Sequence, residues 1–521
     1  MAAAIAVPVL VAVAVAVAPS MWPSTGAATA VAGAGPAFGM TTPAPGLGLD
    51  RDGHWGPVED WPLIAIHAVL SADGDVVTYG TDGDGVQTGR FSYDVWTPGP
   101  SAAEGHITLA NTTRTDLFCN LQLNRADTGD VLLFGGDTLV GGAISGLANR
   151  DIVSYDPDDD GLTSLPGMRR PRWYGTGTTL PDGSIYIQGG VGGEDRAERW
   201  TPEGGAELLP FATDWLDYWY PRNWVMPDGR LFGYDVSGRM YVISAELSTI
   251  TPAGQLPVAG HFRGSSAVMY QPGRIVHFGG GSTTVLLIDA TGDEPVVTIG
   301  EPLRTARQWV DATLLPDGRV LASGGAVKDA QANPGDPIAS FGVAYDAEIW
   351  DPATGQWSLQ APAAVPRLYH STALLLPDGR VLTAGGGAPG PVDEVNAELF
   401  SPDYLHRADG TPTERPVIRS LSATIAGAGD RLGIEVDDPT AVARVTLVKT
   451  GAVTHSFDMD RRFVELPLVA TDTGVEIELP ANRAVLTPGF YLVTALDDEG
   501  IPSVSRMLHV RPEAPGADQG A

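Results

Sequence analysis

The sequence contains one cysteine, Cys119, among 521 residues. A single thiol cannot form a disulfide within the chain, and no Cys-x-x-Cys metal or redox motif can occur. Cys119 lies in the stretch TRTDLFCNLQLNR. Taken alone, such a thiol is typical of a small buried hydrophobic residue, so a chemical role for it requires further evidence.

Positive charge is also scarce. The chain has 32 Lys and Arg against 63 Asp and Glu, a formal net charge of -31. Because phosphate groups are bound through basic surfaces, this balance argues against nucleic acid and anionic membrane surfaces as partners. Gly-x-Ser-x-Gly and His-Glu-x-x-His are absent, and the Gly-Gly pairs lack the helix and lysine of a phosphate loop.

Charged residues are missing from the N-terminal part, where the first is Asp50. Residues 1–18 are continuously apolar and are followed by small residues (PSTGAATAVAGA) that suit signal-peptide cleavage. The run is short for a membrane span. We interpret residues 1–30 as an export segment and 31–59 as a flexible leader, which predicts a secreted, extracellular protein. An uncleaved N-terminal membrane anchor is the alternative.

What the chain does contain is a repeated strand–turn–strand phrase. Complete copies are GTGTTLPDGSIYIQGG (175–190), ATLLPDGRVLASGG (312–325) and TALLLPDGRVLTAGGG (372–387). Degenerate copies lie at 67–82, 119–137, 223–235 and 267–281, which makes seven. Pro-Asp-Gly favours a tight reversal, because proline fixes φ and glycine accepts positive φ. The apolar runs on each side are then paired strands.

A second apolar element follows several copies, as in AERWTP (197–202), AEIWDPATGQW (347–357) and AELFSP (397–402). Four strands per unit, a Gly-Gly after the second and an aromatic residue in the third are typical of kelch-type blades with a period of about 50 residues. The sequence therefore predicts an all-β fold with a seven-bladed kelch-type β-propeller over residues 60–402.

The pattern changes after a linker at residues 403–414. Residues 415–511 contain short alternating runs such as RLGIEV, ARVTLVK and GVEIELP, without helical periodicity. We expect an immunoglobulin-like β-sandwich here, followed by a flexible tail at 512–521.

Four stretches contain candidate site residues: DLFCN, RRPRWYGTG, PRLYHSTALLLPDG and TGAVTHSFDMDRR. Together they resemble the mononuclear copper radical oxidases, the galactose oxidase and glyoxal oxidase family, in which the five corresponding positions occur in this order. The resemblance covers almost everything after residue 60. Its most specific pieces are the Tyr-His pair before LLLPDGRV and the TH…RR stretch.

The resemblance implies a role for each residue. Cys119 would be joined through its sulfur to the ring of Tyr174, the radical ligand, while His370 and His455 supply nitrogen ligands to Cu(II). Tyr369 would be the axial ligand and the base that takes the alcohol proton. Imidazoles and phenol oxygens suit tetragonal Cu(II), and alcohol oxidation by O₂ needs a second one-electron centre that a tyrosyl radical can supply.

Two further expectations concern the surroundings of this site. Arg307, in RTARQWVDATLLPDG, falls where galactose oxidase has a substrate-contacting arginine. The indole that covers the linked tyrosine in galactose oxidase is missing from its usual place, where this chain has Val191 and Gly192. Other tryptophans could substitute for it, and the sequence does not choose among Trp173, Trp219 and Trp309.

The resemblance thus implies a copper-dependent oxidase that converts a primary alcohol, small aldehyde or carbohydrate with O₂ and forms H₂O₂. We expect no galactose-binding N-terminal domain, and RWY is closer to the glyoxal oxidase branch; both points disfavour galactose as substrate. We expect a monomer. The alternative is a non-catalytic kelch and immunoglobulin-like protein that binds glycans or cell-surface partners, although such a module has no reason to retain all five residues.

Overall fold

The short apolar runs of the repeats form antiparallel strands, joined by Pro-Asp-Gly and other tight turns. The computed structural model describes residues 52–87, 92–140, 143–257, 263–329 and 337–512. The export segment predicted at residues 1–30 lies outside these ranges. Within them the helices are three 3₁₀ turns, η1 (Ile338–Ser340), η2 (Asp403–Leu405) and η3 (Pro439–Ala441). None of these is long and apolar enough to cross a membrane.

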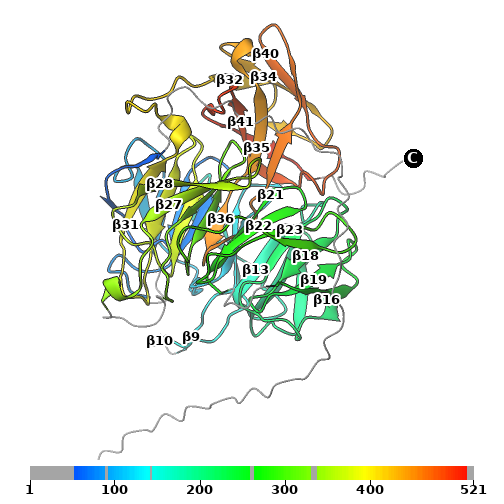
Figure 1. The fold of residues 1–521 in the computed structure, drawn as a ribbon. Coiled ribbons are helices and arrows are strands. Elements are labelled where there is room, and N and C mark those ends of the chain that lie inside the picture. Colours follow the sequence, from blue (N-terminus) through cyan, green and yellow to red (C-terminus); the bar gives the residue numbers. More distant parts are fainter. Residues whose placement is uncertain (1–51, 88–91, 141–142, 258–262, 330–336, 513–521) are drawn as a thin grey trace, which may run out of the picture. The chain divides into compact units, whose positions relative to one another are not determined.

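Seven antiparallel sheets of the described chain form the blades of a propeller (Figure 1). The strands of the first three blades are β3 (His67–Leu70), β4 (Val76–Tyr79), β5 (Ser92–Trp96) and β6 (His106–Ala110); β7 (Leu121–Asn124), β8 (Val131–Phe134), β11 (Ile152–Asp156) and β12 (Gly161–Leu165); and β13 (Trp173–Thr179), β14 (Ile185–Val191), β15 (Arg196–Thr201) and β16 (Gly205–Ala212). A short hairpin of β9 (Leu139–Val140) and β10 (Ala143–Ile144) lies within the second blade's sequence.

The strands of the next three blades are β17 (Arg222–Val225), β18 (Leu231–Tyr234), β19 (Arg239–Ile243) and β20 (Ile250–Gln255); β21 (Ser265–Gln271), β22 (Arg274–Gly279), β23 (Val285–Asp289) and β24 (Val296–Ile299); and β25 (Asp311–Leu314), β26 (Val320–Ser323), β27 (Asp346–Asp351) and β28 (Gln356–Pro362). The innermost strands of most consecutive blades contact one another, and Arg222 of β17 donates a hydrogen bond to the carbonyl of Ser265 in β21 (2.8 Å). β29 of the last blade contacts β3 of the first, so the ring is closed.

The last blade is completed by residues from the beginning of the described chain. It contains β29 (Ser371–Leu375), β30 (Val381–Gly385) and β31 (Asn396–Ser401), and β31 pairs with β1 (His54–Trp55) and β2 (Glu59–Asp60). Among the described residues strand pairing therefore begins at His54, inside the segment 31–59 that we expected to be a flexible leader. The pairing has a physical reason, because joining the two ends of the propeller covers an edge strand that would otherwise be left open.

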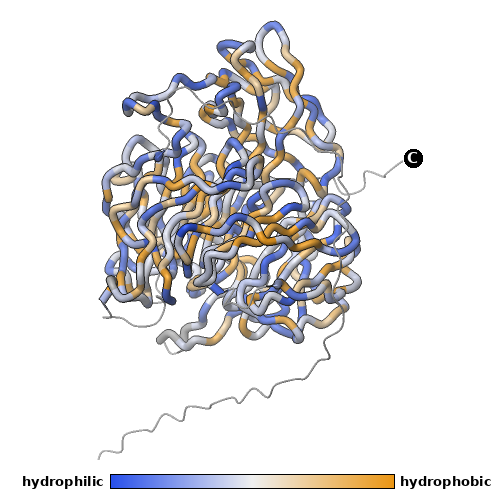
Figure 2. The backbone as a smooth tube through the Cα atoms, viewed as in Figure 1, coloured by the Kyte–Doolittle hydropathy of each residue, from blue (hydrophilic) through white to orange (hydrophobic). Residues whose placement is uncertain are grey.

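The C-terminal part is a sandwich of two sheets around its own apolar core. One sheet has the order β32 (Ile418–Leu421), β34 (Arg431–Val436), β40 (Gly474–Glu478), β39 (Leu468–Ala470); the other has the order β33 (Ile425–Ala426), β42 (Arg506–Val510), β41 (Gly489–Leu496), β35 (Arg444–Lys449), β38 (Phe463–Leu466). Figure 2 shows apolar segments concentrated along the strands and hydrophilic ones at many turns, as expected for sheets that bury one face. The predicted fold class is confirmed.

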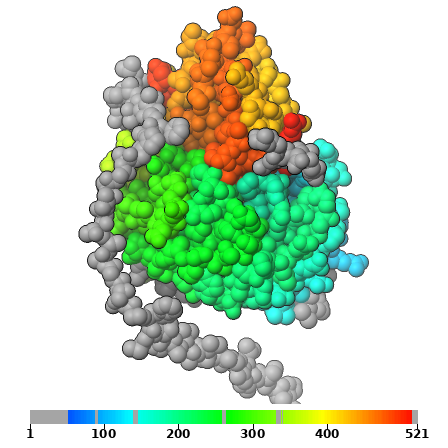
Figure 3. All heavy atoms as spheres, turned by 90° about the vertical axis from the view of Figure 1, so that its right-hand side faces the viewer, coloured from blue at the N-terminus to red at the C-terminus, as the bar shows by residue number. Residues whose placement is uncertain are grey.

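The C-terminal residues of the sandwich pack against the propeller (Figure 3), and their hydrogen bonds reach the turns that follow the innermost strands. Thr446 donates a hydrogen bond to the carbonyl of Pro316 (2.7 Å), and Asn482 donates one to the carbonyl of Pro227 (2.8 Å). The amide of Ser505 donates to the carbonyl of Pro377 (2.8 Å). The Pro-Asp-Gly turns therefore also form the surface that receives the second domain.

One hairpin of the sandwich segment belongs to the propeller sheet. β36 (Ala452–Thr454) pairs with β3, with Thr454 opposite His67, and β37 (Phe457–Asp458) pairs with β36. A buried ion pair between Arg461 and Asp458 (2.8 Å) holds the base of this hairpin. The hairpin follows β3 away from the turns on which the sandwich packs, so its tip at His455 and Ser456 reaches the far end of the innermost strands.

Candidate metal centre

The site is built at one repeated position of the propeller. In the complete repeats, Tyr174, Trp309 and His370 each lie seven residues before the turn proline. Cys119 and Tyr220 hold the corresponding position in two other blades. All five have positive φ (Cys119 54°, Tyr174 71°, Tyr220 38°, Trp309 64°, His370 69°), which is uncommon for residues other than glycine.

Neighbouring blades stabilise this conformation through backbone hydrogen bonds. The amide of Tyr174 donates to the carbonyl of Cys119 (3.0 Å), and the amide of Tyr220 donates to the carbonyl of Tyr174 (2.8 Å). The amide of Trp309 bonds in the same way to Gly264 (2.7 Å), which also has positive φ (72°). The propeller thus places one side chain from each of several blades around its axis.

His455 reaches the same place from the C-terminal hairpin. His455 and Ser456 form its two-residue turn, with φ of 49° and 61°. Two positive φ values are those of a type I′ turn, which normally contains Asn or Gly. Ser266 donates a hydrogen bond to the carbonyl of Ser456 (2.6 Å), so a propeller blade holds the tip in place.

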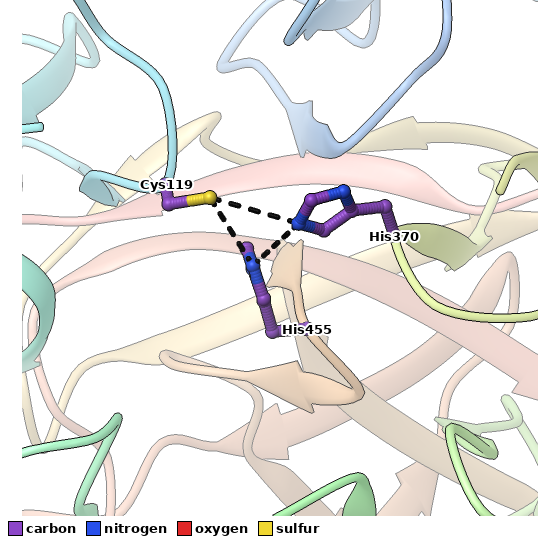
Figure 4. Close-up of side chains that lie close together, drawn as sticks. All are labelled: Cys119, His370 and His455. Carbon is purple, nitrogen blue, oxygen red and sulfur yellow. Dashed lines mark hydrogen bonds between the residues drawn. The ribbon is translucent and has the colours of Figure 1, made fainter. Parts of the chain in front are cut away.

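The two histidines and the cysteine converge in the buried interior (Figure 4). The Nε2 atoms of His370 and His455 are 2.9 Å apart, and Cys119 Sγ lies 3.6 Å from the first and 3.3 Å from the second. None of the three side chains is more than 1% exposed. Figure 4 shows that the imidazole edges and the sulfur point toward one another.

The hydrogen bonds fix which nitrogen of each imidazole carries the proton. His370 Nδ1 lies 2.7 Å from the carbonyl of Gly387, which can only accept. His455 Nδ1 lies 2.6 Å from Thr454 Oγ1, whose own proton goes to the carbonyl of Ile66 (2.9 Å). Both Nδ1 atoms therefore donate, and both Nε2 atoms carry bare lone pairs. Metal-ligating histidines usually donate a hydrogen bond from the ring nitrogen that does not bind the metal, as both Nδ1 atoms do here.

Two bare nitrogens 2.9 Å apart repel each other unless a cation lies beside both. Imidazole ligands at about 2.0–2.1 Å from one metal ion and at a right angle to each other are about 2.9 Å apart. Burial lowers the pKa of His370 to about 3 and lowers the pKa of His455 well below its usual value, which keeps both rings neutral. The donor set therefore fits a borderline metal such as copper.

Both predicted tyrosines line this centre. The ring of Tyr174 is 5.7 Å from that of His455, and the Cys119 thiol and the Tyr174 hydroxyl are hydrogen-bond neighbours. Burial, followed by the neighbouring Cys119 and Tyr369, raises the pKa of Tyr174 far above its usual value. Tyr369 stacks on His370 with a centroid distance of 3.7 Å and is 2% exposed. The structure thus brings Cys119, Tyr174, Tyr369, His370 and His455 together.

The three candidate tryptophans have different positions. Trp173 stacks on Tyr174, with ring centroids 4.4 Å apart and an interplanar angle of 26°. Trp219 is farther from Tyr174, at 5.8 Å and 33°. Trp309 lies against Tyr369 instead, at 4.5 Å. Of the three, Trp173 has the position of a cover over the Tyr174 ring.

The guanidinium of Arg307 is held by partners in its own blade. This group is 1% exposed, pairs with Glu348 (2.8 Å), and donates to the carbonyls of Gly324 and Asp346. Arg172 makes the same pair with Glu198 (2.9 Å) in another blade. Each arginine lies nine residues before the turn proline of its blade. The structure therefore places Arg307 in a buried ion pair of its own blade, and its contact with substrate stays a prediction.

Two residues near the centre were not anticipated. Tyr220 occupies the repeated position in the fourth blade, and its ring lies 4.7 Å from that of His455. Arg263, immediately before the repeated position of the fifth blade, lies over the ring of Trp219 at 5.0 Å. Alignment of the degenerate repeats on the turn would have found both.

Comparisons with known proteins agree with this geometry. The family "Glyoxal oxidase N-terminus" matches residues 258–403, and "Galactose oxidase-like, Early set domain" matches residues 415–510. Galactose oxidase of Gibberella zeae is 27% identical, with 91% of this chain and 72% of that protein covered. Aldehyde oxidase GLOX of Vitis pseudoreticulata is 31% identical, with 76% and 82% covered.

A solved structure of a fungal alcohol oxidase of the AA5 family, in complex with copper, has a similar fold. Its TM-score is 0.78 at 24% identity, with 88% of this chain and 99% of that chain covered. A propeller whose axis carries two bare imidazoles, two phenols and a thiol defines a metal-dependent oxidase. The chain belongs to the mononuclear copper radical oxidase family, that of galactose oxidase and glyoxal oxidase, and is a copper-dependent oxidase.

Proposed function

We propose that this chain is an exported, monomeric oxidase that converts a primary alcohol, a small aldehyde or a related carbohydrate with O₂ into the aldehyde or acid and H₂O₂. The observation that carries the proposal is the pair of neutral imidazoles whose bare Nε2 atoms lie 2.9 Å apart beside Cys119 and two buried tyrosines. A binding module has no use for such a set.

Each residue then has a distinct role. His370 and His455 would hold the copper through Nε2, and Tyr174 and Tyr369 would be its oxygen ligands. Bound copper supplies one of the two electron-accepting centres that alcohol oxidation requires. Tyr369 accepts the proton of the substrate hydroxyl, and Tyr174 in its radical form takes a hydrogen atom from the substrate carbon. O₂ finally receives two electrons and two protons and leaves as H₂O₂.

Cys119 and Trp173 adjust the radical residue. A thioether between Cys119 and Tyr174 would spread the unpaired spin onto sulfur and fix the ring. Trp173 stacks on the same ring (4.4 Å) and shields it from water.

The thioether is the most direct test. After aerobic copper loading, we expect tryptic mass spectrometry to find the peptides of Cys119 and Tyr174 linked, with the loss of two hydrogens. A Cys119→Ser variant should fold and bind copper through the same two histidines but lose most of its oxidase activity. Separate, unlinked peptides from copper-loaded wild-type protein, or full activity in Cys119→Ser, would contradict the radical mechanism.

A second prediction concerns the indole cover. Trp173→Phe should still form the thioether, but the Tyr174 radical should decay about 10- to 100-fold faster, as is usual when a group that supports a metal site is removed. Electron paramagnetic resonance measures the decay. Trp309→Phe is the matched variant, because the Trp309 ring lies against Tyr369, and it should leave the decay rate unchanged. The reverse ranking would make Trp309 the cover.

A further inference from the structure

Tyr220 lies beside the metal centre, against Tyr174 and His455. It is fully buried. Its hydroxyl donates to the carbonyl of Asn120 (3.0 Å), and its amide donates to the carbonyl of Tyr174 (2.8 Å). Its ring lies 4.7 Å from that of His455 and meets the ring of Tyr174 edge-on at 5.6 Å. None of the roles described above uses this residue.

These contacts close a loop of hydrogen bonds around Cys119 and Tyr174. The amide of Tyr174 bonds to the carbonyl of Cys119 (3.0 Å), and Tyr220 bonds both to Tyr174 and to the carbonyl of the residue that follows Cys119. Moving the Cys119 backbone relative to that of Tyr174 would strain these links. Cys119 also needs support, since its φ of 54° is strained for a residue other than glycine.

Two other buried tyrosines, Tyr241 and Tyr186, have ordinary packing roles. The hydroxyl of Tyr241 donates to Asn223 Oδ1 (2.7 Å), and that of Tyr186 donates to Gln188 Oε1 (2.7 Å). Both hydroxyls bond to amide side chains, of Asn223 in β17 and of Gln188 in β14. The hydroxyl of Tyr220 instead goes to the backbone beside the only thiol of the chain.

We propose that Tyr220 is a positioning residue that holds Cys119 against the Tyr174 ring for thioether formation. The inference rests on the proposed function. In the reaction a sulfur–carbon bond forms, while the thiol S–H and one ring C–H bond break. The two electrons and two protons pass to O₂, the acceptor of the proposed oxidase, and give H₂O₂. Such bond formation is fast only when the reacting atoms are held about 3–3.5 Å apart and aligned.

Tyr220→Phe tests the inference, because it removes the hydroxyl and keeps the ring. The time course of linkage is followed by mass spectrometry after copper is added aerobically. We expect the rate to fall at least about tenfold, since a displacement of roughly 1 Å can lower such a rate by 10². Copper affinity and the thermal midpoint should match those of Tyr241→Phe, a buried tyrosine of the same blade that also loses one hydrogen bond.

Tyr220→Leu separates the two parts of the side chain. It also removes the ring from His455, so copper affinity should fall in this variant and not in Tyr220→Phe. Equal linkage rates in wild type, Tyr220→Phe and Tyr241→Phe would overturn the positioning role. Absence of linkage in the copper-loaded wild type would instead contradict the proposed thioether, so the two failures are distinguishable.

Discussion

Replacing His455 with alanine abolishes tight copper binding and the oxidase activity that depends on it. One of two nitrogen ligands is then missing, and we expect the dissociation constant to rise at least about 100-fold, beyond the usual effect of an outer-shell substitution. The side chain comes from a hairpin that is anchored at both ends, by Ser266 at the tip and by the Arg461–Asp458 pair at the base. The fold therefore does not depend on the imidazole.

Thermal unfolding gives a readout that needs no substrate. A ligand at 100 times its dissociation constant raises the free energy of unfolding by about 2.7 kcal/mol. Wild-type protein should gain this from copper, and His455→Ala should gain almost nothing at the same concentration. Competition with a coloured chelator measures the affinity directly.

His277 provides the matched control. It is buried to 3% exposure, and burial lowers its pKa to about 3, as for His370. Its Nδ1 is bonded to the hydroxyl of Tyr234 (2.8 Å) in a different part of the propeller. His277→Gln should keep wild-type copper affinity. Unchanged affinity in His455→Ala, or equal loss in both variants, would remove His455 from the ligand set.

The repeats made most of the fold predictable, because each carries its own local signals. Pro-Asp-Gly turns, Gly-Gly pairs and apolar runs are short-range features. Seven repeats built from these features, in order along the chain, indicate a seven-bladed propeller. The pairing of β1 and β2 with β31 has no such signal. These strands are two residues long and their partner lies more than 300 residues away in the sequence.

The repeated position also explains what was missed at the site. Counting from the turn proline identifies Tyr220 as the equivalent of Tyr174 and His370. Counting also relates Arg307 to Arg172, because Arg307 pairs with the Glu of the third strand in AEIW as Arg172 does with that in AERW. The glutamates of these two stretches, Glu348 and Glu198, are the sequence signal for the two ion pairs.

The placement of His455 and the choice of tryptophan could not be derived locally. Nothing in TGAVTHSFDMDRR indicates that this hairpin joins the sheet of β3, since the contact depends on how two domains pack. The stacking of Trp173 rather than Trp309 on Tyr174 depends on the angle between neighbouring blades. Such relations are properties of the assembled ring and not of any one repeat.

The second large effect is expected for Tyr369→Phe. The ring is held by His370 (3.7 Å) and Trp309 (4.5 Å), so phenylalanine should occupy the same place and only the oxygen is lost. Copper should still bind through His370 and His455, and the thioether should still form. Without the base that takes the hydroxyl proton, kcat should fall by about 10²–10⁴ with little change in KM.

The measurement is the rate of peroxide formation at saturating alcohol, after copper content and thioether linkage have been verified in the same preparation. Tyr404→Phe is the control, because this buried tyrosine of the region after the last blade donates one hydrogen bond to the carbonyl of Gly379 (2.7 Å) and lies apart from the centre. It should lose about 1 kcal/mol of stability and no activity. If Tyr369→Phe retains kcat within a few-fold of wild type, the proton must leave by another group, and Tyr369 is then only a packing partner of His370.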